Sequence, residues 1–181
     1  PENPEEQLQL ARSGVYALWP AGADTGSLMA WAWTMCRGLD MLAGDSRIDA
    51  SRVAVTGSSR LGKASLLAAA CEIRFAAVVL NQTGGGGVPL SKRDFGEHVR
   101  SEVEHYTHWW SPEFAKYAGK EKSMPFDQHL LLSCIAPRPL LVEGFDNPWF
   151  DTYGEFLALR AAAPVWSYLG ATSLPENCSF P

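Results

Sequence analysis

Apolar side chains recur at helical spacing over residues 25–42, the first regularly patterned segment of the chain. Asp24 and Thr25 are candidate caps at its start, and Gly44 is the expected stop. A second helical pattern, rich in Ala and Leu, covers residues 60–71. Two further helices are expected at residues 127–135 and 153–162.

Three short runs rich in apolar residues alternate with these helices and predict strands. They cover residues 53–56, 75–80 and 139–143. An alternation of helix and strand is typical of a parallel sheet. The pattern therefore predicts an α/β fold, with a mostly parallel sheet and helices on both faces.

Two segments depart from this alternation. Residues 88–124 combine charges with aromatic side chains and show no regular period, so they are expected to form helical pieces of an insertion over the sheet edge. Near the start, the apolar patch at residues 15–19 is expected to be a strand or an ordered loop.

Composition excludes several classes of protein. The 181 residues are 46% hydrophobic and 19% charged, which fits a soluble globular domain, and no apolar run approaches the roughly 20 residues that span a bilayer. The net charge of -5 argues against a nucleic-acid partner, because proteins that bind nucleic acids generally carry a basic surface. The four cysteines show no zinc-like spacing, so no metal site is expected.

The candidate chemistry lies where the strand at residues 53–56 runs into the following helix. Gly57-Ser58-Ser59 at such a junction resembles the nucleophile elbow of α/β-hydrolases, which makes Ser59 the candidate nucleophile and Ser58 its rival. The helix N-terminus and Arg60 would offer positive charge to an oxyanion at this point. The usual glycine two residues after the serine is replaced by Leu61, and Gly62 follows one position later.

At this point the chain resembles a known family. The segment GSSRLGK at residues 57–63 is similar to the G-C-S-R-x-G-K signature of the glucuronoyl esterases, carbohydrate esterase family 15, with Ser58 in place of the cysteine. Further similar segments follow in order: NQTGGGG (81–87), HWW (108–110), PFDQH (125–129), APRPL (136–140) and DNPW (146–149).

The resemblance implies an α/β-hydrolase fold and hydrolysis of esters of (4-O-methyl)glucuronic acid in xylan and lignin–carbohydrate complexes. By motif position, Ser59 would be the nucleophile and Arg60 the oxyanion stabiliser. Lys63 would donate to sugar hydroxyls, Glu102 would accept from them, and Trp149 would lie against the sugar ring. The chemistry requires no metal or organic cofactor.

The acid of the triad is open between two carboxylates. Part of the family carries a glutamate just before the glycine-rich segment, where this chain has the uncharged Gln82. The hydrolase fold offers a second location in the loop after the next-to-last strand, which favours Asp146, with Glu143 as the second choice.

No general base is nominated. Hydrolases place the histidine after the acid, whereas His98, His105, His108 and His129 all precede Asp146. The chain is therefore expected to be the central and C-terminal-proximal part of one α/β-hydrolase domain over residues 1–181, with the insertion at about 88–124. On its own it is expected to be inactive for lack of the histidine.

Two other functions stay open. One is a serine esterase of different acyl specificity, such as an acetyl esterase; the other is a non-catalytic remnant of the fold that binds carbohydrate, favoured by Gln82 and the missing histidine. For the leading hypothesis the partner is glucuronoxylan or a lignin–carbohydrate ester, an extracellular polymer. A secreted or periplasmic protein is therefore expected, and its oligomeric state is left open.

Overall fold

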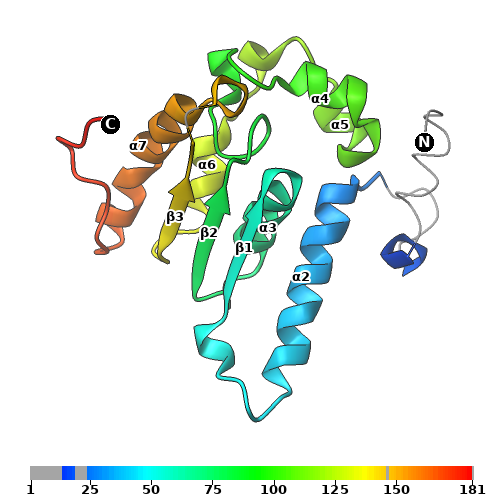
Figure 1. The fold of residues 1–181 in the computed structure, drawn as a ribbon, viewed down its shortest axis with the longest axis vertical. Helices are drawn as coiled ribbons and strands as arrows, with labels where there is room; N and C mark the ends of the chain where they lie inside the picture. Colours follow the sequence, from blue (N-terminus) through cyan, green and yellow to red (C-terminus); the bar gives the residue numbers. More distant parts are fainter. Residues whose placement is uncertain (1–13, 19–23, 146, 181) are drawn as a thin grey trace.

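A parallel sheet of three strands lies at the centre of the protein (Figure 1). The computed structural model describes residues 14–18, 24–145 and 147–180. The strands run in the order β1 (Ala54–Ser58), β2 (Ala77–Asn81) and β3 (Leu140–Glu143). Each of the three predicted strands is present and begins one or two residues later than expected.

The four helices predicted from the sequence are present as α2 (Ser27–Ala43), α3 (Ser59–Cys71), α6 (Gln128–Ser133) and α7 (Thr152–Tyr168). The described residues also contain the short helices α4 (Val99–His105) and α5 (Pro112–Ala115). Helix α7 is longer than predicted because it continues through Pro164. Proline removes one hydrogen bond from a helix, but the buried Trp166 in the next turn packs in the core and donates from Nε1 to the Arg138 carbonyl at 2.9 Å.

Short 3-10 helices fill several connections of the described chain. They are η1 (Gly14–Leu18), η2 (Ala50–Arg52), η3 (Ser91–Arg93), η4 (Thr107–Trp109), η5 (Glu121–Ser123) and η6 (Pro148–Phe150). The apolar patch near the start is thus a 3-10 helix and not a strand, and its last residue, Trp19, lies outside the described residues. Within the described ranges, no helix has both the length and the apolar character that crossing a bilayer requires.

The helices cover one face of the sheet. Val55 and Val78 are partners in register and are buried in the core formed with α3, α6 and α7. The opposite face carries the partners Thr56, Val79 and Leu141, which are exposed or half-buried. The expectation of helices on both faces is therefore not met by the described residues. Each crossover leads to the next strand in the same direction, and right-handed crossovers of this kind place their helices on the same face.

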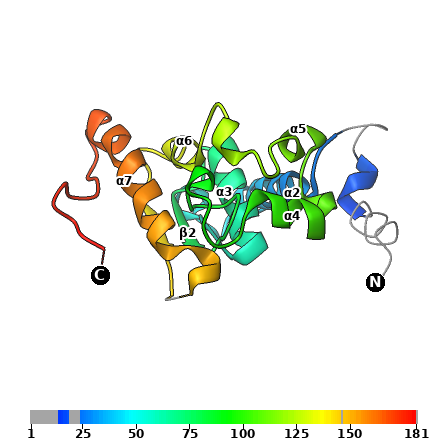
Figure 2. The same ribbon diagram turned by 90° about the horizontal axis from the view of Figure 1, so that it is seen from above.

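The insertion consists of short helical pieces, as predicted, and lies across the carboxyl ends of the strands rather than along a side edge (Figures 1 and 2). It reaches the start of α2, where Ser27 Oγ donates to the His108 carbonyl at 2.9 Å. A Cβ on Gly26 would lie 2.1 Å from the Trp109 carbonyl oxygen. The insertion therefore borders the end of the sheet at which α/β proteins bind their ligands.

Gly57→Ala is expected to lower the free energy of unfolding by about 1–3 kcal/mol, as overpacking does. A Cβ there would lie 2.4 Å from the Leu61 carbonyl oxygen and 2.7 Å from Ser65 Oγ. Gly38→Ala is the matched control, because nothing lies within 4 Å of its Cβ and alanine stabilises a helix by roughly 0.5–1 kcal/mol over glycine. Urea denaturation measures both variants, and equal effects would contradict the packing argument.

Candidate active site

A sharp turn joins β1 directly to α3 at Ser59. Ser58 is extended, with φ -120° and ψ 149°, whereas Ser59 has φ 54°, in the left-handed region that residues other than glycine rarely adopt. Ser59 is exposed. A serine strained in this way between strand and helix has the geometry of a nucleophile elbow, so the turn predicted from the sequence is present.

Packing explains why the glycine of this motif stands one position later than usual. A Cβ on Gly62 would lie 2.9 Å from Thr83 Cγ2 and 3.0 Å from the Gly57 carbonyl oxygen. Leu61, in contrast, is 49% exposed. The close approach of helix to strand therefore requires glycine at position 62 and tolerates leucine at position 61.

Ser58 points to the uncovered face of the sheet and has partners there. Ser58 Oγ donates to Asn81 Oδ1 at 3.1 Å, and Asn81 Nδ2 donates to Glu143 Oε2 at 3.4 Å. These residues end the three strands in register. Glu143, the second choice for the triad acid, is thus an exposed carboxylate at the strand ends. Asp146, the first choice, lies outside the described residues.

Two cations flank the ring of Trp109 beside the elbow. Arg60 Cζ lies 5.9 Å and Lys63 Nζ lies 5.6 Å from the ring centroid. Tyr106 stacks on the same ring, with centroids 4.0 Å apart. Such cation–π contacts contribute about 0.5–1 kcal/mol at exposed sites. Arg60 is exposed and follows Ser59 directly in the sequence, so this contact holds its guanidinium over the Trp109 ring on the elbow side of the insertion.

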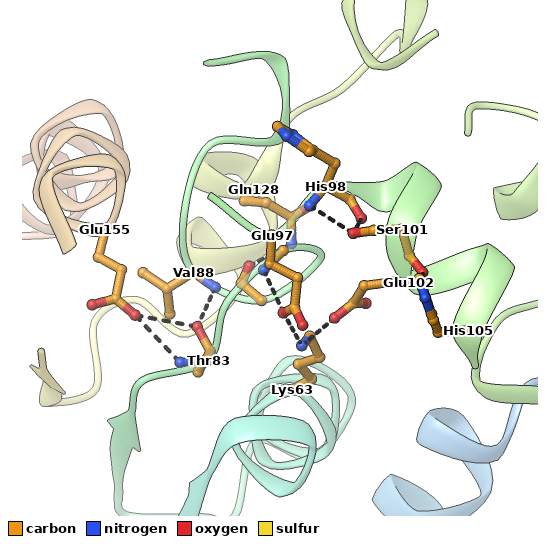
Figure 3. Close-up of polar contacts among 12 residues, drawn as sticks. Lys63, Thr83, Val88, Glu97, His98, Ser101, Glu102, His105, Gln128 and Glu155 are labelled. Atoms are coloured by element: carbon orange, nitrogen blue, oxygen red, sulfur yellow. Dashed lines mark hydrogen bonds and ion pairs between the residues drawn. The ribbon is translucent and has the colours of Figure 1, made fainter. Parts of the chain in front are cut away.

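Lys63 is buried between two carboxylates of the insertion (Figure 3). Its Nζ lies 2.9 Å from Glu97 Oε2 and 2.5 Å from Glu102 Oε1. The side chains of Lys63 and Glu102 are 2% and 0% exposed. The structure therefore brings together two of the residues predicted to contact sugar, but it places them in contact with each other.

Burial also changes the protonation of Glu102. Desolvation of this carboxyl raises its pKa to about 9, because the neighbouring ammonium of Lys63 offsets only part of the cost of burying a charge and the Glu97 carboxylate adds to it. Burial in the folded protein thus favours the neutral form of the Glu102 carboxyl.

Sequence reasoning missed Glu97, which joins three parts of the site. Its carboxylate accepts from the Gly85 N–H at 3.1 Å as well as from Lys63, and its own N–H donates to the Trp149 carbonyl at 2.7 Å. No local pattern distinguishes Glu97 from the other acidic residues of the insertion. Only the three-dimensional contacts reveal it.

Trp149 lies in η6, in the loop between β3 and α7. It is 52% exposed, and its backbone N–H donates to Asn147 Oδ1 at 3.0 Å. Thr152 Oγ1 donates to the Phe145 carbonyl at 2.6 Å, which closes the loop at the start of α7. An exposed aromatic face is therefore available on this side of the strand ends.

Glu155 is a second buried carboxyl that the sequence did not single out. Thr83 donates to its Oε1 from both N–H and Oγ1 at 3.4 Å (Figure 3). Desolvation raises the pKa of Glu155 to about 7, although the bonds from Thr83 oppose this and the carboxylate of Asp151 adds to it. The available signal was its place in the first turn of the predicted helix, where acidic residues are favoured.

The four histidines lie in the insertion and in α6. His98 caps α4, His105 ends it, His108 is in η4 and His129 is in α6. Burial lowers the pKa of His108.

Glu102→Gln is expected to flatten the pH dependence of stability between pH 7 and 9. The folded pKa of Glu102 is raised to about 9 from 4.5, so the folded state keeps a proton that the unfolded state releases. Stability is therefore lost as pH rises towards 9, by about 1.4 kcal/mol per pH unit for one proton. Denaturation of both proteins at pH 7, 8 and 9 measures this, and parallel slopes would exclude a protonated Glu102.

Comparison with known proteins places the chain in a family. The profile described as "Glucuronyl esterase, fungi" matches residues 4–170. Carbohydrate esterase MZ0003, from an unknown prokaryotic organism, is 42% identical over 156 residues, covering 86% of this chain and 36% of that protein. The 4-O-methyl-glucuronoyl methylesterase of Podospora anserina is 32% identical over 189 residues, covering 94% of this chain and 39% of that protein.

A solved structure agrees with these matches. A glucuronoyl esterase from Solibacter usitatus is similar with a TM-score of 0.82 at 38% identity, covering 88% of this chain and 42% of that chain. This likeness confirms the α/β-hydrolase fold. The chain spans less than half the length of each of these relatives. Because the family profile matches nearly all of its residues, the chain belongs to the glucuronoyl esterases of carbohydrate esterase family 15.

Proposed function

We propose that this protein is a serine-type carboxylic ester hydrolase that cleaves esters of (4-O-methyl)glucuronic acid in xylan and lignin–carbohydrate complexes. The observation that carries the proposal is the exposed, strained Ser59 at the junction of β1 and α3, with Arg60 beside it. The acyl group follows from the family and from the name of the Podospora anserina relative.

Ester cleavage begins at the Ser59 hydroxyl. Its oxygen forms a bond to the ester carbonyl carbon while its proton passes to a base, and the carbonyl oxygen becomes negative. The N–H groups at the start of α3 and the Arg60 guanidinium stabilise this oxyanion. Collapse of the intermediate releases the alcohol, which takes the proton, and leaves a glucuronoyl ester on Ser59. Water then attacks in the same way and releases the uronic acid.

The base in this chemistry is a histidine oriented by a carboxylate. We assign the acid to Asp146, with Glu143 as the second choice. None of the four histidines is assigned as the base, because all of them precede Asp146 and hydrolases of this fold have the order serine, acid, histidine.

The sugar is proposed to lie against the exposed ring of Trp149, above Lys63 and Glu102. Because the Lys63 side chain is only 2% exposed, a sugar hydroxyl that reaches Nζ must displace a carboxylate. Because burial raises the pKa of Glu102 to about 9, we propose that its neutral carboxyl donates to a sugar hydroxyl once the substrate is bound. This differs from the acceptor role expected from the sequence.

The proposed substrate also sets the expected location of the protein. Xylan and its lignin esters lie outside the cell, so we propose that the protein acts after export, in the medium or the periplasm. The reaction uses side chains, backbone donors and water, and no metal or organic cofactor is proposed.

A serine esterase of broader acyl specificity is the second candidate. The relative with 42% identity carries the wider name of carbohydrate esterase. Hydrolysis of p-nitrophenyl acetate with a kcat/KM equal to that for methyl glucuronate would favour this candidate.

The kinetic tests use the complete gene product, since the chain on its own is expected to be inactive. In that protein, Ser59→Ala is expected to lower hydrolysis of methyl glucuronate by at least about 10⁴-fold, because the nucleophile is lost. It is also expected to abolish covalent labelling by a fluorophosphonate. Ser58→Ala is the control and is expected to keep the label, since its hydroxyl is bonded to Asn81. Sugar binding without any labelling of the unchanged protein would instead support a non-catalytic carbohydrate-binding domain.

Arg60→Ala is expected to lower kcat for methyl glucuronate by about 10²–10³-fold, the cost of removing an oxyanion donor. Its KM is expected to change little, because the guanidinium acts on charge that develops in the transition state. Steady-state kinetics separate the two constants. A rise in KM at constant kcat would assign Arg60 to ground-state binding instead.

A further inference from the structure

We infer that Trp109 is a positioning residue that holds the Arg60 guanidinium in place at the start of α3 before the reaction begins, and so contributes to kcat. The inference rests on the proposed function, in which Arg60 stabilises the oxyanion. It extends that function to a tryptophan of the insertion that acts on the reaction through Arg60.

Arg60 depends on the Trp109 ring for its position. The residue is exposed, and its Cζ lies 5.9 Å from the ring centroid, within the range over which tryptophan attracts a guanidinium. In the part of the chain that the structure describes, the Arg60 guanidinium makes no hydrogen bond or ion pair. An unrestrained arginine side chain samples many rotamers, so the ring is the contact that selects among them.

Lys63 approaches the same ring but is held by other partners. Its Nζ lies 5.6 Å from the ring centroid. It also pairs with Glu97 at 2.9 Å and with Glu102 at 2.5 Å. Loss of the Trp109 ring is therefore expected to release Arg60 and to leave Lys63 where it is.

The Trp109 ring is itself fixed on several sides. It is 5% exposed and forms a small hydrophobic cluster with Leu28 of α2 and Ala64 of α3. Tyr106 stacks on it, with centroids 4.0 Å apart and planes 7° from parallel. A Cβ on Gly26 would lie 2.1 Å from the Trp109 carbonyl oxygen, so the backbone is also in close contact with the start of α2. The ring is thus a rigid support for a mobile side chain.

A cation that is already in place is what an oxyanion requires. The negative charge develops only in the transition state, and a group placed beforehand stabilises it without reorganising at that moment. A mobile guanidinium must first lose conformational freedom. The carbonyl of the bound ester is neutral, so the same restraint adds little to substrate binding. Trp109 is therefore expected to affect kcat and not KM.

The test is a double-mutant cycle on the complete gene product, with methyl glucuronate as the substrate. Trp109→Leu is expected to lower kcat about two- to fivefold, which is the strength of one exposed cation–π contact, with little change in KM. In the Arg60→Ala background, Trp109→Leu is expected to have no further effect on kcat, because no guanidinium is left to position. A general packing defect would instead lower kcat in both backgrounds.

Two further variants separate the ring from its volume. Trp109→Phe leaves a side chain closer in size to leucine than to tryptophan but keeps a weaker aromatic partner, so it is expected to lower kcat less than Trp109→Leu. It also replaces Trp109→Leu in the cycle if that variant does not fold. Trp33→Leu is the matched control, because its ring lies 5.6 Å from the Arg37 guanidinium on the same helix, α2. It is expected to leave kcat unchanged.

NMR relaxation of the arginine Nε–H groups measures the restraint directly. The Arg60 signal is identified by its absence from Arg60→Ala. Its order parameter, which reports motion on the picosecond to nanosecond scale, is expected to fall in Trp109→Leu. Arg93 serves as the internal reference, because its Nε donates to Asp151 at 2.9 Å and its order parameter is expected to stay the same.

Equal losses of kcat with and without Arg60, or an unchanged order parameter of Arg60, overturn the inference. A rise in KM at constant kcat in Trp109→Leu overturns it as well. Failure of the unchanged gene product to hydrolyse methyl glucuronate would overturn the proposed function instead. The order parameter would still decide whether Trp109 holds Arg60.

Discussion

The ammonium group of Lys63 is the interaction on which the arrangement of the site depends. It stands one turn into α3, the helix that begins at Ser59, and both of its partners, the Glu97 carboxylate and the Glu102 carboxyl, come from the insertion. Burying a lone ammonium or carboxylate costs several kcal/mol. Lys63, Glu97 and Glu102 are therefore buried together or not at all. The folding of the insertion is in this way coupled to the helix that begins at Ser59.

This coupling explains how an irregular segment borders the end of the sheet without a long helix of its own. The insertion is built from pieces of seven residues or fewer, and such pieces have little stability in isolation. Their contacts with α2, α3 and the loop after β3 supply what local hydrogen bonding does not. The candidate site is thus a product of contacts between distant segments.

The sequence predicted the features that local patterns encode. Helical periodicity predicted α2 and α3, and the Gly-x-Ser sequence between strand and helix predicted the turn at Ser59. Contacts between residues far apart in the sequence could not be predicted from local patterns. Glu97 and Lys63 are 34 positions apart, and Thr83 and Glu155 are 72 positions apart. The uncovered sheet face also escaped prediction, because alternation of helices and strands does not say on which face each crossover lies.

The carboxyl of Glu155 has a consequence for the purified protein. Burial raises its pKa to about 7, which brings the gain and loss of its charge into the pH range of ordinary buffers. A signal from the neighbourhood of Thr83 is therefore expected to change with pH in that range without any change of fold.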